Sequence, residues 1–179
     1  MKKVAIIGAG ISGLFIANLF KKKLNYEISI YEKNDSINLD EGYGIQLSVN
    51  SIKLLNKIGF DKMKDSQKFY PKKLDFYLNN KLQKFCELEI SKFNSNDCKY
   101  TTLKRSTLIN FLKSNLEEHI KVKKKISKIE QENQQIMLHF ENKEINVCDY
   151  LIISDGVFSK SKNLIFNSRI KPKYNGTLA

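Results

Sequence analysis

The pattern of hydrophobic and polar positions near the start of the chain predicts a strand, a helix and a second strand. Residues 3–7 form a short apolar run, which is typical of a buried parallel strand. From Ile11 the apolar positions follow helical spacing up to the Lys21–Lys23 cluster, whose cations favour the negative end of a helix dipole. Residues 26–31 then alternate as a second strand. Together the three elements have the size of a βαβ crossover.

The next part of the chain predicts a loop, a helix and a β-rich stretch. Residues 33–47 read as a polar loop. Ser48 is the predicted N-cap of a helix, and Gly59 is the residue expected to end it. Residues 70–103 are β-like but irregular, with a turn predicted at Asn79-Asn80.

The last third of the chain predicts one more helix and several strands. Apolar residues share one face of that helix, namely Leu108, Phe111, Leu112 and Leu116. Apolar and Lys residues mostly alternate over Ile120–Ile126, as on a half-exposed strand. We therefore expect strands over 120–130, 135–140, 143–148 and 150–153.

Composition indicates an ordinary globular protein and changes little in this picture. The 179 residues leave room for one domain or slightly more. Lys and Arg number 31 against 19 Asp and Glu, so the net charge is +12. Nearly all of these cations are Lys, and only Arg105 and Arg169 are Arg. Nucleic-acid readers depend on Arg for bidentate contacts, so we interpret the charge as a solvated surface and expect no nucleic-acid partner.

Cysteine usage and the amino terminus bear on the cellular compartment. The three cysteines are an odd number without a C-x-x-C pair, which argues against disulfides and against a Cys-based metal site. The apolar stretch Val4–Phe20 imitates a signal peptide, but glycines interrupt it and no cleavage site follows. It is also shorter than the ~20 residues that span a membrane. We therefore expect no transmembrane segment, no metal and a cytoplasmic location.

The chemistry lies in the motif G-x-G-x-x-G at Gly8, Gly10 and Gly13, between the first strand and the helix. Gly8 permits a tight turn, Gly10 lets a pyrophosphate approach the backbone, and Gly13 lets the helix pack close to the strand. The N–H groups at the helix start would hold the phosphates. Glu32 ends the second strand and can accept hydrogen bonds from ribose hydroxyls. Its charge would repel a 2′-phosphate, so we expect FAD or NAD rather than NADP.

Four stretches of the sequence resemble the FAD-dependent aromatic-ring hydroxylases, a family of flavoprotein monooxygenases. They occur in the family's order and at compatible spacings. These stretches are Val4–Leu14 around the glycines, Gly42–Asn50 running on to Phe60, Lys104–Leu108 with an Arg-x-x-Leu pattern, and Asp149–Ser159 with an Asp-Gly motif. Each would be weak evidence alone, but together they identify the resemblance from one end of the chain to the other.

The resemblance implies roles for particular residues but assigns no catalytic residue. The ADP half of FAD would be held by Gly8, Ala9, Gly10, Ile11, Ser12, Gly13, Glu32 and Lys33. Gln46 would lie toward the flavin, and Arg105 would contact FAD from the start of a helix. Asp155 and Gly156 would lie near the pyrophosphate. The sequence departs from the family at Ser154, where Ala is usual, and at Lys162, where Arg is usual.

The implied fold class is α/β: a Rossmann-like FAD-binding domain with part of a β-rich substrate domain inserted. Residues 1–69 would bind FAD, and 70–103 would begin the substrate domain. Residues 104–166 would return to the FAD-binding domain, and 167–179 would begin another substrate-domain segment. Relatives continue to a Gly-Asp motif that holds the flavin, and nothing after Gly156 supplies one. We therefore expect a fragment of a longer protein or a truncated product.

The implied activity is that of an FAD-dependent monooxygenase that uses NADH or NADPH and O₂ to hydroxylate an aromatic or quinone-like small molecule. Such chemistry resides in the cofactor, which agrees with the lack of a catalytic triad or carboxylate pair in the sequence. Two alternatives stay open. The chain could be a non-catalytic FAD-binding remnant, or another FAD enzyme of the same fold such as an epoxidase or a prenyl-lipid reductase.

Overall fold

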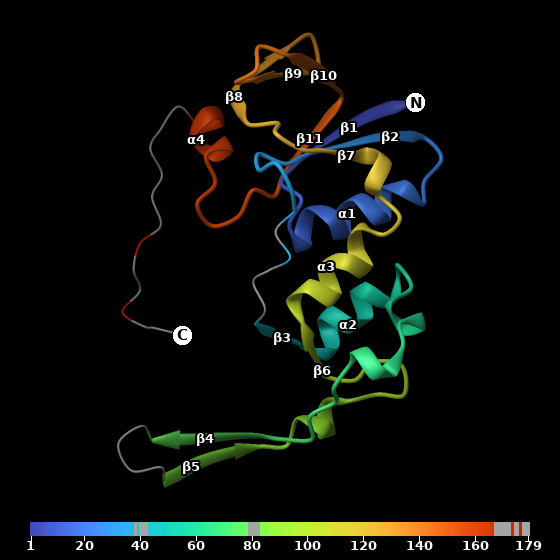
Figure 1. Cartoon of the computed structure of the whole chain (residues 1–179), viewed down its shortest axis with the longest axis vertical. Coiled ribbons are helices and arrows are strands. Elements are labelled where there is room, and N and C mark those ends of the chain that lie inside the picture. The colour runs from blue at the N-terminus through green and yellow to red at the C-terminus, as the bar shows by residue number, and fades with distance from the viewer. Residues whose placement is uncertain (38, 40–42, 79–82, 167–172, 174–175, 177–179) are drawn as a thin grey trace. The chain divides into compact units, whose positions relative to one another are not determined.

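The computed structural model describes residues 1–37, 39, 43–78, 83–166, 173 and 176 (Figure 1). The chain forms two compact units. The first, which we call the split unit, consists of Met1–Asn38 and Leu112–Ala179. The second, the inserted unit, consists of Leu39–Phe111. The predicted division into FAD-binding and substrate domains uses other boundaries and concerns function, and it stays a prediction.

The split unit is built on a parallel sheet of four strands in the order β11-β1-β2-β7. Its strands are β1 (Lys2–Ile7), β2 (Tyr26–Tyr31), β7 (Ile120–Lys121) and β11 (Tyr150–Ile153). Val4 to Ile7 are all buried, which explains the unbroken apolar run of the central strand β1. Helix α1 (Ile11–Lys21) joins β1 to β2 and buries Gly13, Leu14 and Ala17. The predicted strand–helix–strand unit and the Rossmann-like fold class are confirmed.

An antiparallel sheet of three strands completes the split unit, in the order β10-β9-β8. Its strands are β8 (Ile126–Glu132), β9 (Gln135–Phe140) and β10 (Ile145–Cys148). Leu138, Phe140 and Cys148 pack with Ala5 and Tyr31 of the parallel sheet in one buried cluster. A short 3-10 helix (Glu117–His119) precedes β7, and helix α4 (Ser161–Phe166) follows β11.

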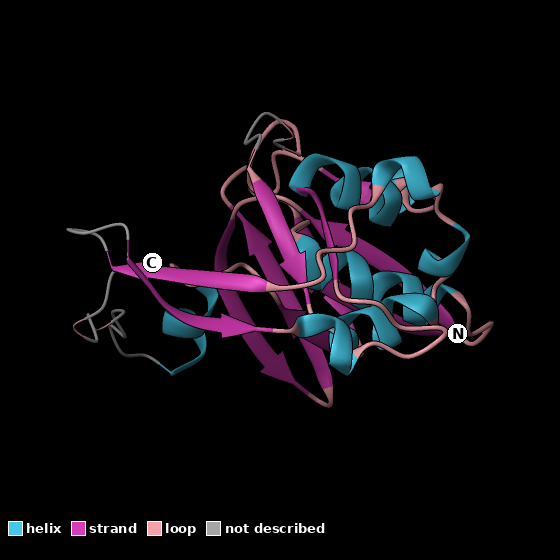
Figure 2. Cartoon of the chain, turned by 90° about the horizontal axis from the view of Figure 1, so that it is seen from below, coloured by secondary structure: helices cyan, strands magenta, loops and turns pink. Residues whose placement is uncertain are grey.

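The inserted unit combines short strand pairs with helices (Figure 2). Its regular elements are β3 (Gly44–Leu47), α2 (Val49–Asn56), β4 (Leu74–Leu78), β5 (Gln83–Leu88), β6 (Thr101–Lys104) and α3 (Arg105–Lys113), with 3-10 turns at Phe60–Lys62, Asp65–Gln67 and Ile90–Phe93. Strand β3 pairs with β6, and β4 pairs with β5, both antiparallel. Phe60 is buried and meets the edge of Phe111 at 5.5 Å between ring centres. Helix α3 runs on from this unit into the split unit.

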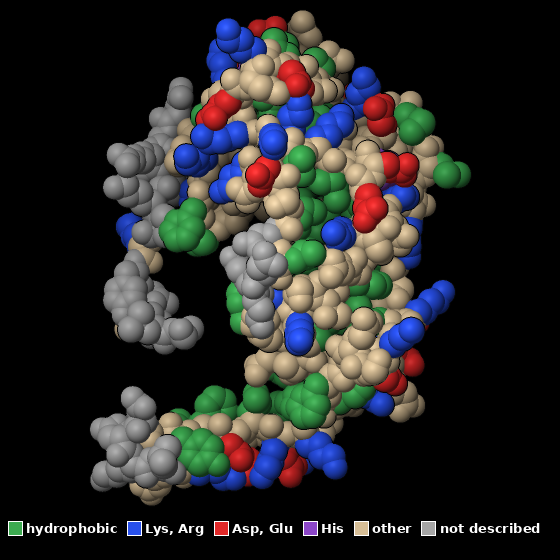
Figure 3. All heavy atoms as spheres, viewed as in Figure 1, with side chains coloured by type: hydrophobic (Ala, Val, Ile, Leu, Met, Phe, Trp, Pro, Cys, Tyr) green, Lys and Arg blue, Asp and Glu red, His purple; other side chains and the backbone are tan. Residues whose placement is uncertain are grey.

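On the face of the molecule that Figure 3 draws, charged side chains are interspersed rather than gathered by sign. Figure 3 shows Lys and Arg scattered among Asp and Glu, and hydrophobic side chains along one side of the β4–β5 hairpin. On that hairpin, Lys73 pairs with Glu87 at 3.0 Å and Lys84 with Asp75 at 3.2 Å. This pattern supports the reading of the charge as a solvated surface.

The strand predicted over 120–130 is wrong, because the chain forms two strands there in two different sheets. The break lies at Lys123, whose φ is +55°, in the left-handed region that strands exclude. The N–H of Lys123 donates to the Asn34 carbonyl and that of Lys124 to the Glu32 carbonyl, both at 2.8 Å. The turn is therefore tied to the end of β2, a contact that alternation within the segment does not reveal.

The structure also differs from two other local predictions, the loop over 33–47 and the end of the helix that follows it. The predicted loop 33–47 contains β3, which is stabilised by pairing with the distant β6. Helix α2 ends at Asn56, and Gly59, at φ +93°, precedes a 3-10 turn instead of following the helix directly. Gly42, the predicted Asn79-Asn80 turn and most of 167–179 lie outside the described residues. Among the residues that are described, no helix has the length and apolar character needed to cross a membrane.

Candidate dinucleotide-binding site

The loop between β1 and α1 folds as tightly as its glycines predict. Gly8 has φ +98°, and a Cβ there would lie 2.6 Å from the carbonyl oxygen of Ser154. A Cβ on Gly13 would lie 2.0 Å from the carbonyl oxygen of Gly8 and 2.7 Å from Ser154 Oγ. Only glycine fits either position, because the first needs a left-handed backbone and both need close backbone approach.

Gly10 differs from its two neighbours in the motif, since its surroundings are open. Its φ is −81°, which any residue can adopt, and no described atom lies within 4 Å of where a Cβ would stand. It is the N-cap of α1, and the first turn of that helix carries no acidic side chain. A helix N-terminus next to open space and without a capping side chain favours an anion there. Ile11 and Ser12 belong to this first turn.

Glu32 is held by the backbone on both sides of its carboxylate. Oε2 accepts the N–H of Ala9 and Oε1 accepts the N–H of Asn34, each at 3.0 Å. Glu32 therefore braces the glycine loop, a role that the sequence did not predict. A carboxylate offers about four acceptor sites. Capacity for ribose hydroxyls therefore remains, and the exposed Lys33 follows Glu32 directly.

The Asp-Gly motif lies directly after β11, beside β1. Ser154 donates both its N–H and its hydroxyl to the Ile7 carbonyl, each at 2.8 Å. Asp155 Oδ2 accepts the N–H of Ser161 at 3.2 Å, whereas its buried Oδ1 has no partner among the described residues. Burial alone would raise the pKa of Asp155, but hydrogen bonds from Ser159 and Ser161 outweigh it and lower the pKa. The group therefore stays a carboxylate at neutral pH.

These segments meet around a cleft of about 520 Å³ at the carboxyl ends of β1, β2 and β11. It is lined by Ile7, Gly8, Gly10, Tyr31, Glu32, Lys33, Asn34, Lys124, Lys125, Ile126, Ser154, Asp155, Gly156, Phe158, Lys160 and Ser161. The central strand β1 has β2 on one side and β11 on the other. The cleft lies at the end of β1 where the chain leaves it to connect to β2. Open α/β sheets bind their ligands at such a switch point.

The sequence predicted part of this cleft, including Lys33, but not its other three lysines. Gly8, Gly10, Glu32, Lys33, Asp155 and Gly156 line it together. Ala9 in the loop, and Ile11, Ser12 and Gly13 in the first turn of α1, are not among the lining residues. Lys124 and Lys125 were expected on a half-exposed strand, and they reach the cleft only because of the turn at Lys123. Lys160 lies close to the Asp-Gly motif in sequence, which is the one signal that could have indicated it.

Gln46 and Arg105 belong to the inserted unit, and their predicted contacts with a flavin stay predictions. Gln46 lies in β3, and its Oε1 accepts the hydroxyl of Tyr100 at 2.9 Å. Arg105 begins α3 and donates its N–H to the Tyr43 carbonyl at 3.1 Å. Its guanidinium also lies over the Tyr43 ring, 5.9 Å from the ring centre.

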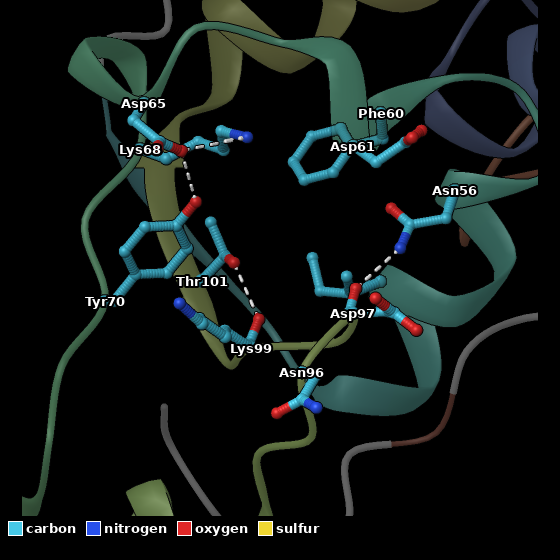
Figure 4. A pocket seen from close by; sticks show the side chains of 11 residues that line it. Asn56, Phe60, Asp61, Asp65, Lys68, Tyr70, Asn96, Asp97, Lys99 and Thr101 are labelled. Atoms are coloured by element: carbon cyan, nitrogen blue, oxygen red, sulfur yellow. Dashed lines mark hydrogen bonds and ion pairs between the residues drawn. The ribbon is translucent and has the colours of Figure 1, made fainter.

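A second cavity of about 430 Å³ lies within the inserted unit (Figure 4). Asp65 accepts the hydroxyl of Tyr70 at 2.7 Å and pairs with Lys68 at 3.4 Å. Burial and the neighbouring Asp65 raise the pKa of Tyr70 to about 12. The Lys68 ammonium lies 5.5 Å from the centre of the Phe60 ring. These groups satisfy one another, which is typical of a structural network, so the glycine cleft is the better candidate site.

Ser154→Ala is expected to lower the free energy of unfolding by about 1 kcal/mol, the usual net value of one intramolecular hydrogen bond. The change removes the half-buried bond from Ser154 Oγ to the Ile7 carbonyl and leaves the backbone bond in place. Urea unfolding followed by circular dichroism measures the difference. Ser127→Ala removes a similar bond at an exposed site and should cost less. Equal costs would contradict a special role for Ser154.

Known proteins with similar sequences and folds are flavoprotein monooxygenases. Residues 6–39 match the family described as NAD(P)-binding Rossmann-like domain. The 6-hydroxynicotinate 3-monooxygenase of Bordetella bronchiseptica is 23% identical over 99% of this chain and 46% of its own length. The structure of 2,6-dihydroxypyridine-3-hydroxylase from Arthrobacter nicotinovorans superposes with a TM-score of 0.79 and 17% identity, covering 98% of this chain and 42% of that one. A variant of HpxO from Klebsiella pneumoniae, complexed with FAD, gives 0.78 and 17%, covering 91% and 42%.

The chain spans less than half the length of each of these proteins. The similarity nevertheless extends over nearly all of the chain itself, as the four sequence stretches predict. This chain therefore resembles the FAD-dependent monooxygenases in sequence from end to end, and it has the Rossmann-like fold of their solved structures.

Proposed function

We propose that the glycine cleft binds FAD and that the chain supplies the dinucleotide-binding part of an FAD-dependent, NAD(P)H-using monooxygenase. The observation that carries this proposal is the meeting of Gly10, Glu32 and Asp155 at one cleft, at the carboxyl ends of three parallel strands. The resemblance to FAD-dependent monooxygenases supports FAD over NAD as the dinucleotide.

The residues present fit the ADP half of FAD. The open space at Gly10 would take the pyrophosphate against the start of α1. The remaining acceptor capacity of Glu32 would serve the adenosine ribose. Asp155 also lines the cleft, and the backbone N–H of Ser161 donates to its Oδ2. When bound, FAD would supply the redox chemistry, with electrons from NADH or NADPH and oxygen from O₂.

The substrate we infer is an aromatic or quinone-like small molecule. Two of the similar proteins are named for hydroxylated pyridine rings, 6-hydroxynicotinate and 2,6-dihydroxypyridine. Hydroxylated pyridines are therefore the first compounds to test. A cytoplasmic location suits this reaction, because NAD(P)H is supplied there and the three cysteines match a reducing compartment.

The test starts with the purified chain. We expect a yellow protein that releases flavin fluorescence on acid treatment and that NADH or NADPH bleaches in the absence of air. A colourless protein that also fails to take up added FAD would contradict FAD binding. Product formation in air with a hydroxylated pyridine would then identify the monooxygenase activity.

One observation favours a second candidate function, a flavin-binding unit without turnover of its own. The chain covers 46% of the length of the Bordetella enzyme, so the resemblance supports flavin binding more directly than turnover. A yellow protein that neither NADH nor NADPH bleaches would favour this candidate. An epoxidase or prenyl-lipid reductase of the same fold would instead be indicated if alkenes reacted and hydroxylated pyridines did not.

A further inference from the structure

We propose that Lys160 binds the pyrophosphate of the dinucleotide, and that Lys162, where the family has arginine, does not. This inference rests on the proposed function and adds a binding residue to the same cleft. It starts from the charges around that cleft, which comprise the carboxylates Glu32 and Asp155 and four lysines.

Most of these charges already have partners. Lys124 pairs with Glu144, and Lys125 pairs with Glu141 at 2.6 Å. Glu32 and Asp155 accept backbone N–H groups. Within the described ranges, Lys33 and Lys160 are the two lining lysines whose ammonium groups have no carboxylate partner. Two ammonium groups thus remain that can bind a pyrophosphate directly, next to two carboxylates that backbone N–H groups hold in place but do not neutralise.

The backbone after the Asp-Gly motif carries Lys160 to the cleft. Gly156 turns the chain at φ +84°, and the bond from Ser161 N–H to Asp155 Oδ2 closes the loop that Lys160 ends. Lys160 consequently lines the same cleft as Gly10, where the backbone is open. Lys162 lies two positions further on, in α4, and does not line the cleft.

The physical role of Lys160 would be that of a flexible point charge. Ammonium–phosphate hydrogen bonds are charge-assisted and stronger than neutral ones, and lysine binds phosphates in this way at many sites. The positive end of the α1 dipole would act on the same phosphates. Because the Lys160 side chain is exposed, salt should screen its contribution.

The experiment compares ADP binding by the whole chain with wild-type sequence, Lys160→Ala, Lys160→Arg and Lys162→Ala, using isothermal titration calorimetry. We expect Lys160→Ala to weaken ADP binding about tenfold, the effect of losing one hydrogen bond to a charged group, and to flatten its salt dependence. Lys160→Arg should retain most of the affinity, and Lys162→Ala should bind as the wild type does. Adenosine, which lacks phosphates, should bind all four chains equally.

Two results would overturn the assignment. One is ADP affinity in Lys160→Ala equal to that of wild type. The other is an equal loss for adenosine, which would indicate a distorted cleft rather than a lost phosphate contact. If the wild-type chain itself binds neither ADP nor FAD, that result contradicts the proposed function, and the assignment of Lys160 fails for the same reason. Circular dichroism of each variant identifies any change in folding.

Discussion

Gly13→Ala is expected to destabilise the split unit by about 3 kcal/mol or more, the upper range for overpacking a tight site. The added methyl would lie 2.0 Å from the Gly8 carbonyl oxygen and 2.7 Å from Ser154 Oγ. The first of these neighbours is backbone, which cannot turn aside as a side chain can. Helix α1 would have to move away from β1, where Leu14 and Ala17 are fully buried. Urea unfolding by circular dichroism measures the loss.

Gly10→Ala is the matched control within the same motif. Its methyl would meet no described atom within 4 Å, and its φ of −81° suits alanine. We expect the free energy of unfolding to change by less than about 1 kcal/mol. The methyl would nevertheless occupy the space proposed for the pyrophosphate, so FAD affinity should fall. Equal stability of the two variants would contradict the close packing at Gly13.

Glu32→Ala is expected to weaken FAD binding by roughly 10- to 100-fold, the effect of losing hydrogen bonds between a carboxylate and the ribose hydroxyls. The change also removes the acceptors of the Ala9 and Asn34 N–H groups, so the glycine loop should loosen. Quenching of flavin fluorescence on titration measures the affinity, and denaturant unfolding measures the loop's contribution to stability.

Two further variants separate these effects. Glu32→Gln keeps the size and one oxygen acceptor, so it should retain more stability than Glu32→Ala while still losing affinity for FAD. Glu27→Ala changes an exposed acid in β2, the strand that Glu32 follows, and should alter neither quantity. Unchanged FAD affinity in Glu32→Ala would remove the ribose role and leave Glu32 as a structural brace.

The parts of the fold that sequence predicts well are those in which neighbours along the chain decide the structure. The apolar run of β1, the helical spacing of α1 and the alternation of β2 are each local patterns. The turn at Gly8 and the close approach of Gly13 to the Gly8 carbonyl are likewise predictable, because they join consecutive elements, whereas the contacts of both glycines with Ser154 are not. The Asp-Gly motif is recognisable because it directly follows the apolar strand β11.

Sequence fails where pairing with a distant segment overrides the local pattern. The turn at Lys123 exists because the N–H groups of Lys123 and Lys124 bond to the carbonyls at the end of β2. Strand β3 is short and irregular in pattern, and it forms because β6 pairs with it. Neither pairing leaves a periodic signal in its own segment.

The amino-acid sequence by itself therefore determined the dinucleotide motif, the β1–α1–β2 unit and the resemblance to flavoprotein monooxygenases. Only the tertiary structure decided which charges meet at the cleft. Glu32 reaches across to the Ala9 N–H, and Lys124, Lys125 and Lys160 arrive from segments far along the chain. The physical reason is that a binding surface is made where strand ends converge. That convergence depends on the order of strands in the sheet rather than on spacing along the chain.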